Sequence, residues 1–428
     1  MRCTDTDTGK NWIQIGTVVQ PEASQRPKVS YQGKEYDFVF DVDTEEGKPP
    51  LKLPYNLSDD MYQAATKFLN DNDLPITYLE SVAGFIRDNT KDAVPGRSSQ
   101  SAPSSQQQPT TRSVATYLPH TEYLALTQAR LEPALKKLKE FNAEHIKSGS
   151  KHIALNPGNV SFLETVVQAL ATAPSAQNNG GLPNPEGSKQ ILSTIITQWP
   201  YGNRLPALDI LRCLVAKQGA ATLSDEQHGS LLHVALRGAL DTEQPVRDSP
   251  NLADFIAGVD WGQINPNNLM MVLRAIVNLF LTQEGRELAI KERAAILGLM
   301  IRISGAEDGK AAVGASNNNF QAALVTANFN FACYAFNERR KSPPDEHIDL
   351  GDLTQLLSVA EAVIRRQSDA EVLFRACMAT GMIIAADGDS KELAKTLAVE
   401  EWLKVASSKN SDPRIKTVVT ECSAYLKQ

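Results

Sequence analysis

Two different spacings of hydrophobic residues divide the chain. In KVSYQGKEYDFVFDVD (28–43), apolar and polar residues alternate in two runs on either side of Gln32-Gly33, which predicts two strands joined by a turn. WIQIGTVV (12–19) is a third strand candidate. LKLPYN (51–56) is a short extended segment, which Pro54 limits to an edge or an end of a sheet.

Apolar residues at spacings of three and four then predict two helices. The first follows Ser58, a suitable N-cap residue, and places Phe68 on its apolar face. The second, TYLESVAGFIRDN (77–89), places Phe85 on one side. Strands and helices together predict a small α+β domain over residues 11–92.

The rest of the chain is a polar segment followed by helices. Residues 93–116 are rich in Ser, Gln and Pro, so we expect a flexible linker there. From 117 to 428, the helices expected lie near residues 121–147, 160–172, 188–198, 206–217, 225–240, 268–282, 288–303, 319–337, 351–367, 370–385 and 413–426. Their lengths and pairing predict an all-α armadillo/HEAT-like solenoid, with a globular helical bundle as the alternative.

The charge distribution narrows the classes of partner. The chain carries a formal net charge of −7, which argues against nucleic acid as its main partner. Residues 1–91 contain ten Lys and Arg against fifteen Asp and Glu, so the acidic excess lies mostly in the first domain. No apolar run of about 18 residues occurs, and MRCTDTDTGK lacks an apolar signal core. We therefore expect a soluble monomer without membrane insertion, in the cytoplasm and nucleus.

The motifs of common enzyme classes are missing. The sequence contains no HExxH, GxxxxGK[ST], GxSxG or GxGxxG. Its five cysteines are scattered without a CxxC pair, and its six histidines are widely spread. These features predict a non-catalytic protein with no metal site and no cofactor.

Three strongly apolar helices each contain one arginine. They are Arg212 in PALDILR, Arg274 in VLRAIVNLF and Arg375 in LFRACMATGMII. Neighbouring helices of a solenoid can place such residues side by side along one groove. A guanidinium group binds carboxylates with two parallel hydrogen bonds, so the three arginines are candidates for a row of anion-binding residues.

A local ion pair is the alternative explanation for two of these arginines. Asp209 precedes Arg212 by three residues and Glu371 precedes Arg375 by four, which are the spacings of intrahelical ion pairs. Arg274 has no acidic residue at either spacing. It therefore needs a tertiary partner or a ligand, or it extends to water.

Two asparagines also interrupt apolar helices. Asn278 and Asn330 lie within VLRAIVNLF and TANFNFACYAF. Either amide could hold the backbone of an extended peptide, or could be a core amide whose hydrogen bonds go to a neighbouring helix.

Several of these segments resemble one known family. KVSYQGKEYDFVFDVD, LKLPYNLSDDMYQAATKFLNDNDLP and VAGFIRDNTK resemble, in order and spacing, the PFU domain of the PLAA (phospholipase-activating protein) family over about residues 11–92. PALDILR, VLRAIVNLF and LFRACMATGMII resemble its PUL domain, which covers about residues 117–428. Family members also have an N-terminal WD-repeat propeller, and no propeller strands are expected before Trp12.

The resemblance implies that the PFU domain binds ubiquitin. Phe68 and Phe85 match positions associated with ubiquitin binding in that family. Both also lie at helical spacing on apolar faces, where core packing is the usual explanation. The sequence leaves direct contact and core packing open for both residues.

For the PUL domain, the resemblance implies an armadillo-type array that binds the acidic C-terminal tail of a hexameric AAA ATPase, valosin-containing protein. Arg212 and Arg375 match the motif arginines that hold this tail, and Arg274, Asn278 and Asn330 are further candidates. The function expected is a non-catalytic adaptor that joins ubiquitin and ubiquitylated proteins to the ATPase. The alternative is a helical scaffold that binds another acidic peptide or regulates a phospholipase.

Overall fold

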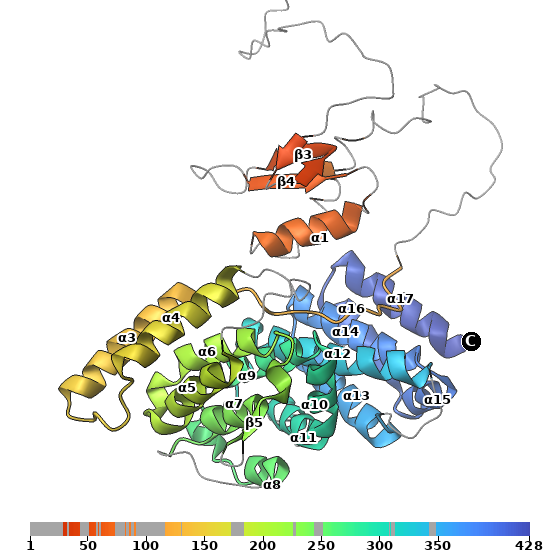
Figure 1. Cartoon of the computed structure of the whole chain (residues 1–428). Helices are drawn as coiled ribbons and strands as arrows, with labels where there is room; N and C mark the ends of the chain where they lie inside the picture. Colours follow the sequence, from red (N-terminus) through yellow and green to blue (C-terminus); the bar gives the residue numbers. More distant parts are fainter. Residues whose placement is uncertain are drawn as a thin grey trace, which may run out of the picture. The chain divides into compact units, whose positions relative to one another are not determined.

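We describe the protein from a computed structural model (Figure 1). The chain divides into two compact units, Met1–Gln108 and Pro109–Gln428, with the boundary inside the expected linker. Within the described residues, no helix is both long and apolar enough to cross a membrane. The residues described are 29–31, 34–42, 51–56, 59, 61–72, 82, 85–86, 90, 116–129, 131–172, 184–225, 228–243, 251–307, 309, 313–341 and 348–428.

The first unit contains two antiparallel strand pairs and a helix. The elements are β1 (Val29–Tyr31), β2 (Lys34–Tyr36), β3 (Phe38–Val42), β4 (Leu51–Tyr55) and α1 (Met61–Asp71). Pairing of Val29 with Tyr36 confirms the predicted hairpin, and β3 pairs with β4. The strand candidate 12–19 lies outside the described residues, as does most of the helix expected at 77–89.

The second unit is an array of helices in two layers. Its helices are α3 (Leu131–Lys147), α4 (Pro157–Thr172), α5 (Pro185–Gln198), α6 (Leu205–Leu214), α7 (Leu231–Leu240), α8 (Leu252–Ala257), α9 (Pro266–Leu279), α10 (Gln283–Lys291), α11 (Arg293–Ser304), α12 (Asn318–Arg339), α13 (Leu350–Arg366), α14 (Ala370–Ile384), α15 (Gly388–Thr396), α16 (Val399–Lys409) and α17 (Pro413–Lys427). Two residues each form β5 (Ser224–Asp225) and β6 (Gly229–Ser230).

The array has the order expected of a solenoid. Helices α3, α6, α9, α12, α14 and α17 pack successively against one another as an inner row, while α5, α7, α11, α13 and α16 pack behind them (Figure 1). Buried apolar side chains form one continuous core through both layers. The predicted combination of a small α+β domain and an all-α array is therefore confirmed.

One segment predicted to be helical is extended instead. The helix expected near 121–147 begins only at Leu131, and residues 121–129 form no helix. The backbone N–H and C=O groups of Leu124 and Leu126 are bonded to side chains of distant helices, so they are not available for helical bonds. The prediction of a single helix at 288–303 was also wrong, because the chain there belongs to two helices, α10 and α11.

A buried arginine joins two of the outer helices. Arg204 is fully buried, and its guanidinium donates hydrogen bonds to the carbonyl oxygens of Trp199 at 2.9 Å, Gly238 at 3.1 Å, Asp241 at 2.6 Å and Glu243 at 2.7 Å. These carbonyls lie at or beyond the C-terminal ends of α5 and α7, where helical partners run out. Burial lowers the pKa of Arg204 to about 10, so the side chain remains charged at neutral pH.

We expect Arg204→Met to lower the free energy of unfolding by about 3 kcal/mol or more, because it leaves several buried carbonyl oxygens without donors. Arg204→Lys should be intermediate, since one ammonium group cannot reach all four acceptors. Urea unfolding followed by circular dichroism measures this difference. A change below about 0.5 kcal/mol for Arg204→Met would contradict this role.

Candidate peptide-binding groove

An extended segment of the chain itself crosses the inner row of helices. We call residues 117–129 the strap; it runs along the inner helices from α17 to α6 (Figure 1). At one end, the Glu421 carboxylate of α17 accepts the N–H groups of Tyr117 at 3.1 Å and Leu118 at 2.9 Å. At the other end, Arg212 of α6 donates to the carbonyl oxygen of Gln128 at 2.7 Å. The groove therefore already contains an extended peptide.

Two buried amides hold the middle of the strap. The Asn278 Oδ1 atom accepts the N–H of Leu126 at 2.8 Å, and its Nδ2 donates to the Leu126 carbonyl at 3.1 Å. Asn330 does the same for Leu124, with both distances 2.9 Å. Each Nδ2 also donates to a helix carbonyl, that of Arg212 or Val277. We call Asn278 and Asn330 the amide pair.

The amide pair corrects part of the sequence-based expectation. Asn278 and Asn330 do hold the backbone of an extended peptide, but that peptide is the chain's own strap rather than an ATPase tail. Both side chains are fully buried, and their oxygen and nitrogen atoms are already bonded. In this structure these atoms are thus taken up by the chain itself, and their assignment as tail-binding residues stays a prediction.

Side chains of the strap fix it at its first end and near its middle. Leu118 is buried beside Gly381 of α14, where a Cβ atom would lie only 2.2 Å from Leu118 Cδ1. The Tyr117 ring packs edge-on against Phe374, with centroids 5.3 Å apart. The Tyr123 ring packs near Phe280, with ring centroids 5.5 Å apart. Burial raises the pKa of the Tyr123 hydroxyl group to about 12.

Arg212 is fully engaged within the chain. Its Nε donates to Asp209 Oδ1 at 2.7 Å, its Nη1 to the Leu126 carbonyl at 2.5 Å and its Nη2 to the Gln128 carbonyl. The side chain is 3% exposed. The local ion pair considered from the sequence is thus present, and the remaining donors hold the strap.

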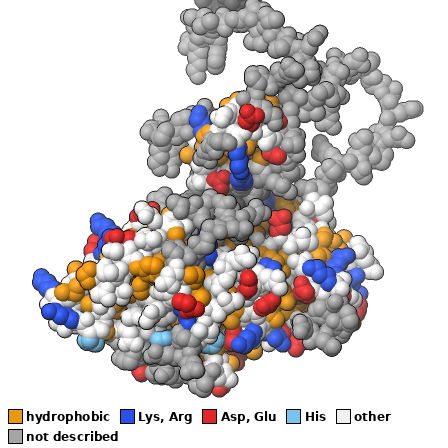
Figure 2. All heavy atoms as spheres, in the orientation of Figure 1, with side chains coloured by type: hydrophobic (Ala, Val, Ile, Leu, Met, Phe, Trp, Pro, Cys, Tyr) orange, Lys and Arg blue, Asp and Glu red, His pale blue; other side chains and the backbone are white. Residues whose placement is uncertain are grey.

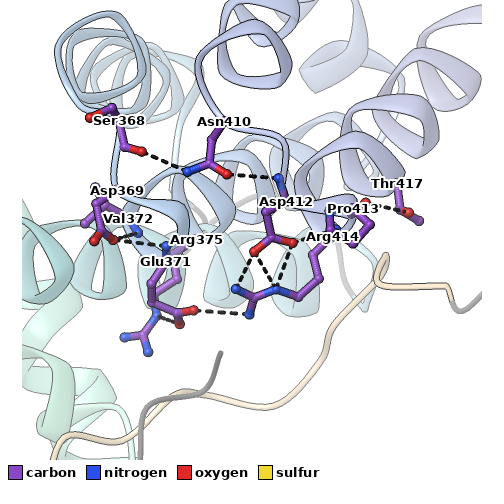
Figure 3. A network of polar contacts seen from close by, with 10 residues as sticks. All are labelled: Ser368, Asp369, Glu371, Val372, Arg375, Asn410, Asp412, Pro413, Arg414 and Thr417. Atoms are coloured by element: carbon purple, nitrogen blue, oxygen red, sulfur yellow. Dashed lines mark hydrogen bonds and ion pairs between the residues drawn. The ribbon is translucent and has the colours of Figure 1, made fainter. Parts of the chain in front are cut away.

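Arg375 lies in a polar network at the other end of the inner row (Figure 3). Its Nε donates to Glu371 Oε1 at 2.7 Å and its Nη1 to Thr326 Oγ1 at 2.5 Å. Glu371 is shared with Arg414, which also pairs with Asp412 at 2.8 Å. Burial alone would lower the pKa of Arg414, but its bonds to these two carboxylates outweigh burial and raise it.

Arg274 has a surplus of positive charge around it. Its Nε atom is buried and has no hydrogen-bond partner within the described part of the chain. Burial and the neighbouring Arg212 lower its pKa. Asp209, the carboxylate among the described residues that acts against this shift, is already bonded to Arg212. The sequence argument that Arg274 needs a tertiary partner or a ligand therefore persists in the structure.

Arg274 and the hydroxyl group that binds Arg375 each lie one helical turn from a member of the amide pair. Arg274 precedes Asn278 by four residues on α9, and Thr326, which binds Arg375, precedes Asn330 by four residues on α12. We call the two arginines, Arg274 and Arg375, together with Thr326, which binds Arg375, the arginine row. On the face drawn in Figure 2, acidic and basic side chains of the described residues are mixed.

In the first unit, the two candidate phenylalanines differ in burial. Phe68 of α1 is 2% exposed and lies in a core with Leu53, Tyr55 and Ile86. Phe85 is only partly buried, with its ring edge-on to Phe40 at 5.4 Å between centroids. Packing accounts for Phe68, whereas Phe85 has surface available for contact.

The cysteines among the described residues are buried. Burial raises the pKa of the Cys213 thiol to about 11 and those of Cys333 and Cys377 to about 12, so thiolates are scarce at neutral pH. Within the described residues, no group of three or more His, Cys, Asp or Glu could hold a metal ion.

The sequence analysis missed one arrangement that superficially resembles a hydrolase triad. Ser230 Oγ lies 2.8 Å from His233 Nδ1, and His233 Nε2 lies 3.9 Å from Glu292 Oε1. Ser230 is 5% exposed and caps the N-terminus of α7 through its side chain. The arrangement therefore serves as a helix cap.

Known families match most of the chain. The PUL domain family matches residues 118–421, and the PFU family, described as PLAA family ubiquitin binding, matches residues 5–94. A crystal structure of a PUL and PFU domain covers 92% of this chain and 99% of its own, with 22% identity and a TM-score of 0.45.

Curated relatives resemble the chain over different lengths. Phospholipase A-2-activating protein of Xenopus laevis is 26% identical over 97% of this chain and 52% of its own length. Protein DOA1 of Saccharomyces cerevisiae is 33% identical over 49% of this chain and 27% of its own. Ubiquitin homeostasis protein lub1 of Schizosaccharomyces pombe is 32% identical over 47% of this chain and 26% of its own. The chain thus spans about half the length of the first relative and about a quarter of the others.

We expect Asn278→Ala to destabilise the helical unit by about 2–3 kcal/mol, because the Leu126 N–H loses its acceptor and the carbonyl oxygens of Leu126 and Arg212 each lose a donor. Asn267→Ala, on the exposed side of the same helix, is the matched control and should be nearly neutral. Thermal unfolding followed by circular dichroism compares the two variants. Equal midpoints for both would show that the amide pair does not secure the strap.

Proposed function

Because the chain belongs to the family that combines a PFU domain with a PUL domain, we propose that it is a non-catalytic adaptor in ubiquitin homeostasis. In this proposal the first unit binds ubiquitin and ubiquitylated proteins. The second unit binds the acidic C-terminal tail of a hexameric AAA ATPase, valosin-containing protein. The description of the PFU family as ubiquitin binding and the name of the lub1 relative support the ubiquitin half.

The observation that carries the ATPase half is the surplus positive charge at Arg274. A buried guanidinium nitrogen without an acceptor is unfavourable. Arg274 as a whole is only partly buried, and a ligand carboxylate bound to its guanidinium group would offset the positive charge. Arg375 offers a second point of attachment, because the hydrogen bonds of its Nε and Nη1 leave Nη2 without a partner among the described residues. Two such points along one groove suit an extended acidic peptide better than a single ion.

Two separate units would let the protein bind both partners at once. The two compact units each have a hydrophobic core of their own. Binding one unit to the ATPase would raise the effective concentration of the other near ubiquitylated substrates. Weak affinity for ubiquitin would then be sufficient for capture.

Arg274→Gln should weaken binding of a synthetic peptide with the ATPase tail sequence about ten- to hundredfold, because a charge-assisted hydrogen bond is lost. Calorimetry on the full chain measures the affinity, and circular dichroism checks the fold. Arg365→Gln on α13 is the control, since that side chain is 57% exposed and pairs locally with Glu361.

The same titration separates the ATPase tail from other acidic ligands. A peptide that lacks the final residues of the tail should not bind measurably. If it bound as well as the complete tail, or if Arg274→Gln kept wild-type affinity, the ATPase assignment would be wrong. A scrambled acidic peptide that bound equally would favour the more general scaffold instead.

For ubiquitin, we expect Phe85→Ala to reduce binding while the first unit stays folded, because this ring is partly exposed. Phe68→Ala should unfold that unit, since removing a core phenylalanine costs about 3–5 kcal/mol. NMR titration with labelled ubiquitin reports binding, and the amide spectrum of the variant reports folding. Unchanged ubiquitin shifts with folded Phe85→Ala would exclude contact through this residue.

A further inference from the structure

The strap has one backbone edge that the groove does not use. The N–H and C=O groups of Leu124 and Leu126 point to the amide pair. In an extended chain, consecutive residues direct their backbone groups to opposite edges. Those of Ala125 therefore point away from the amide pair, and they make no hydrogen bond to the described residues. The residue itself is exposed.

An open backbone edge beside two arginines is a composite binding surface. An extended peptide that pairs with a strand forms main-chain hydrogen bonds, while alternate side chains read the surface beside it. Arg274 lies one helical turn from the residue that holds Leu126, and Thr326, the partner of Arg375, lies one turn from the residue that holds Leu124. Acidic side chains on the incoming peptide would suit these two arginines.

We propose that an acidic extended peptide binds on the closed strap, pairs as a strand with the free edge at Ala125 and places its carboxylates on Arg274 and Arg375. The strap is thus part of the binding site and is not displaced from the groove. This inference rests on the proposed function, because the peptide is the ATPase tail. It adds the mode of binding and the role of the strap backbone.

Retention of the strap follows from the number of buried bonds that hold it. Release would break the bonds of both Oδ1 atoms of the amide pair and of Arg212 Nη1 and Nη2 to the strap, and it would expose Leu118. A short peptide would have to replace all of these contacts to displace it. Binding beside the strap needs none of them to break.

The test removes one backbone N–H without removing a strap contact. Ala125→Pro deletes the free donor, and proline is compatible with an extended neighbour at Leu124. Ala125→Val keeps the donor and is the matched control. In calorimetry with the synthetic tail peptide on the full chain, Ala125→Pro should lower the affinity about three- to tenfold, and Ala125→Val should not.

If Ala125→Pro disturbs the strap, amide hydrogen exchange on the wild-type chain tests the same binding mode without a substitution. Saturating peptide should slow exchange at Ala125 while Leu124 and Leu126 stay protected. Faster exchange at Leu124 and Leu126 would show that the peptide displaces the strap and would overturn the proposal, as would wild-type affinity in folded Ala125→Pro. A wild-type chain that binds no tail peptide would overturn the proposed function, and this inference with it.

Discussion

The helical unit depends on the pairing of two buried side-chain amides with the backbone of an extended segment. Asn278 and Asn330 are fully buried, and each satisfies both backbone groups of one strap residue and a helix carbonyl. Buried polar groups are costly when unpaired, so the amides and the strap require each other. The inner row of helices is therefore complete only when the strap lies across it.

This constraint decides which groups remain for a partner. The strap takes the amide pair and the free donors of Arg212, so a ligand cannot be held by the same atoms in the same state. Within the part of the chain that the structure describes, Arg274 Nε has no hydrogen-bond partner, and Arg375 has a donor beyond its bonds to Glu371 and Thr326. In the proposed function, recognition of an acidic peptide therefore falls to the arginine row, and the strap would supply the backbone edge beside it.

Much of this could be predicted from the sequence, and the exceptions have physical causes. The alternation of apolar and polar residues predicted the β1–β2 hairpin. The absence of an acidic residue three or four positions from Arg274 indicated that this arginine needs a more distant partner. Asn278 stood out as a polar residue in an apolar helix, but its partner Leu126 lies 152 residues away in sequence, where no local pattern reports it. The sequence of the strap predicted a helix. The strap is extended instead, because Leu124 and Leu126 obtain their hydrogen bonds from tertiary contacts rather than from neighbouring residues.

Amide hydrogen exchange of the free chain in solution, resolved by residue, tests the central claim most directly. If the amide pair holds the strap in the groove, the amides of Leu124 and Leu126 exchange slowly and that of Ala125 between them exchanges rapidly. Exchange of all three at the rates of an unstructured peptide would contradict the account.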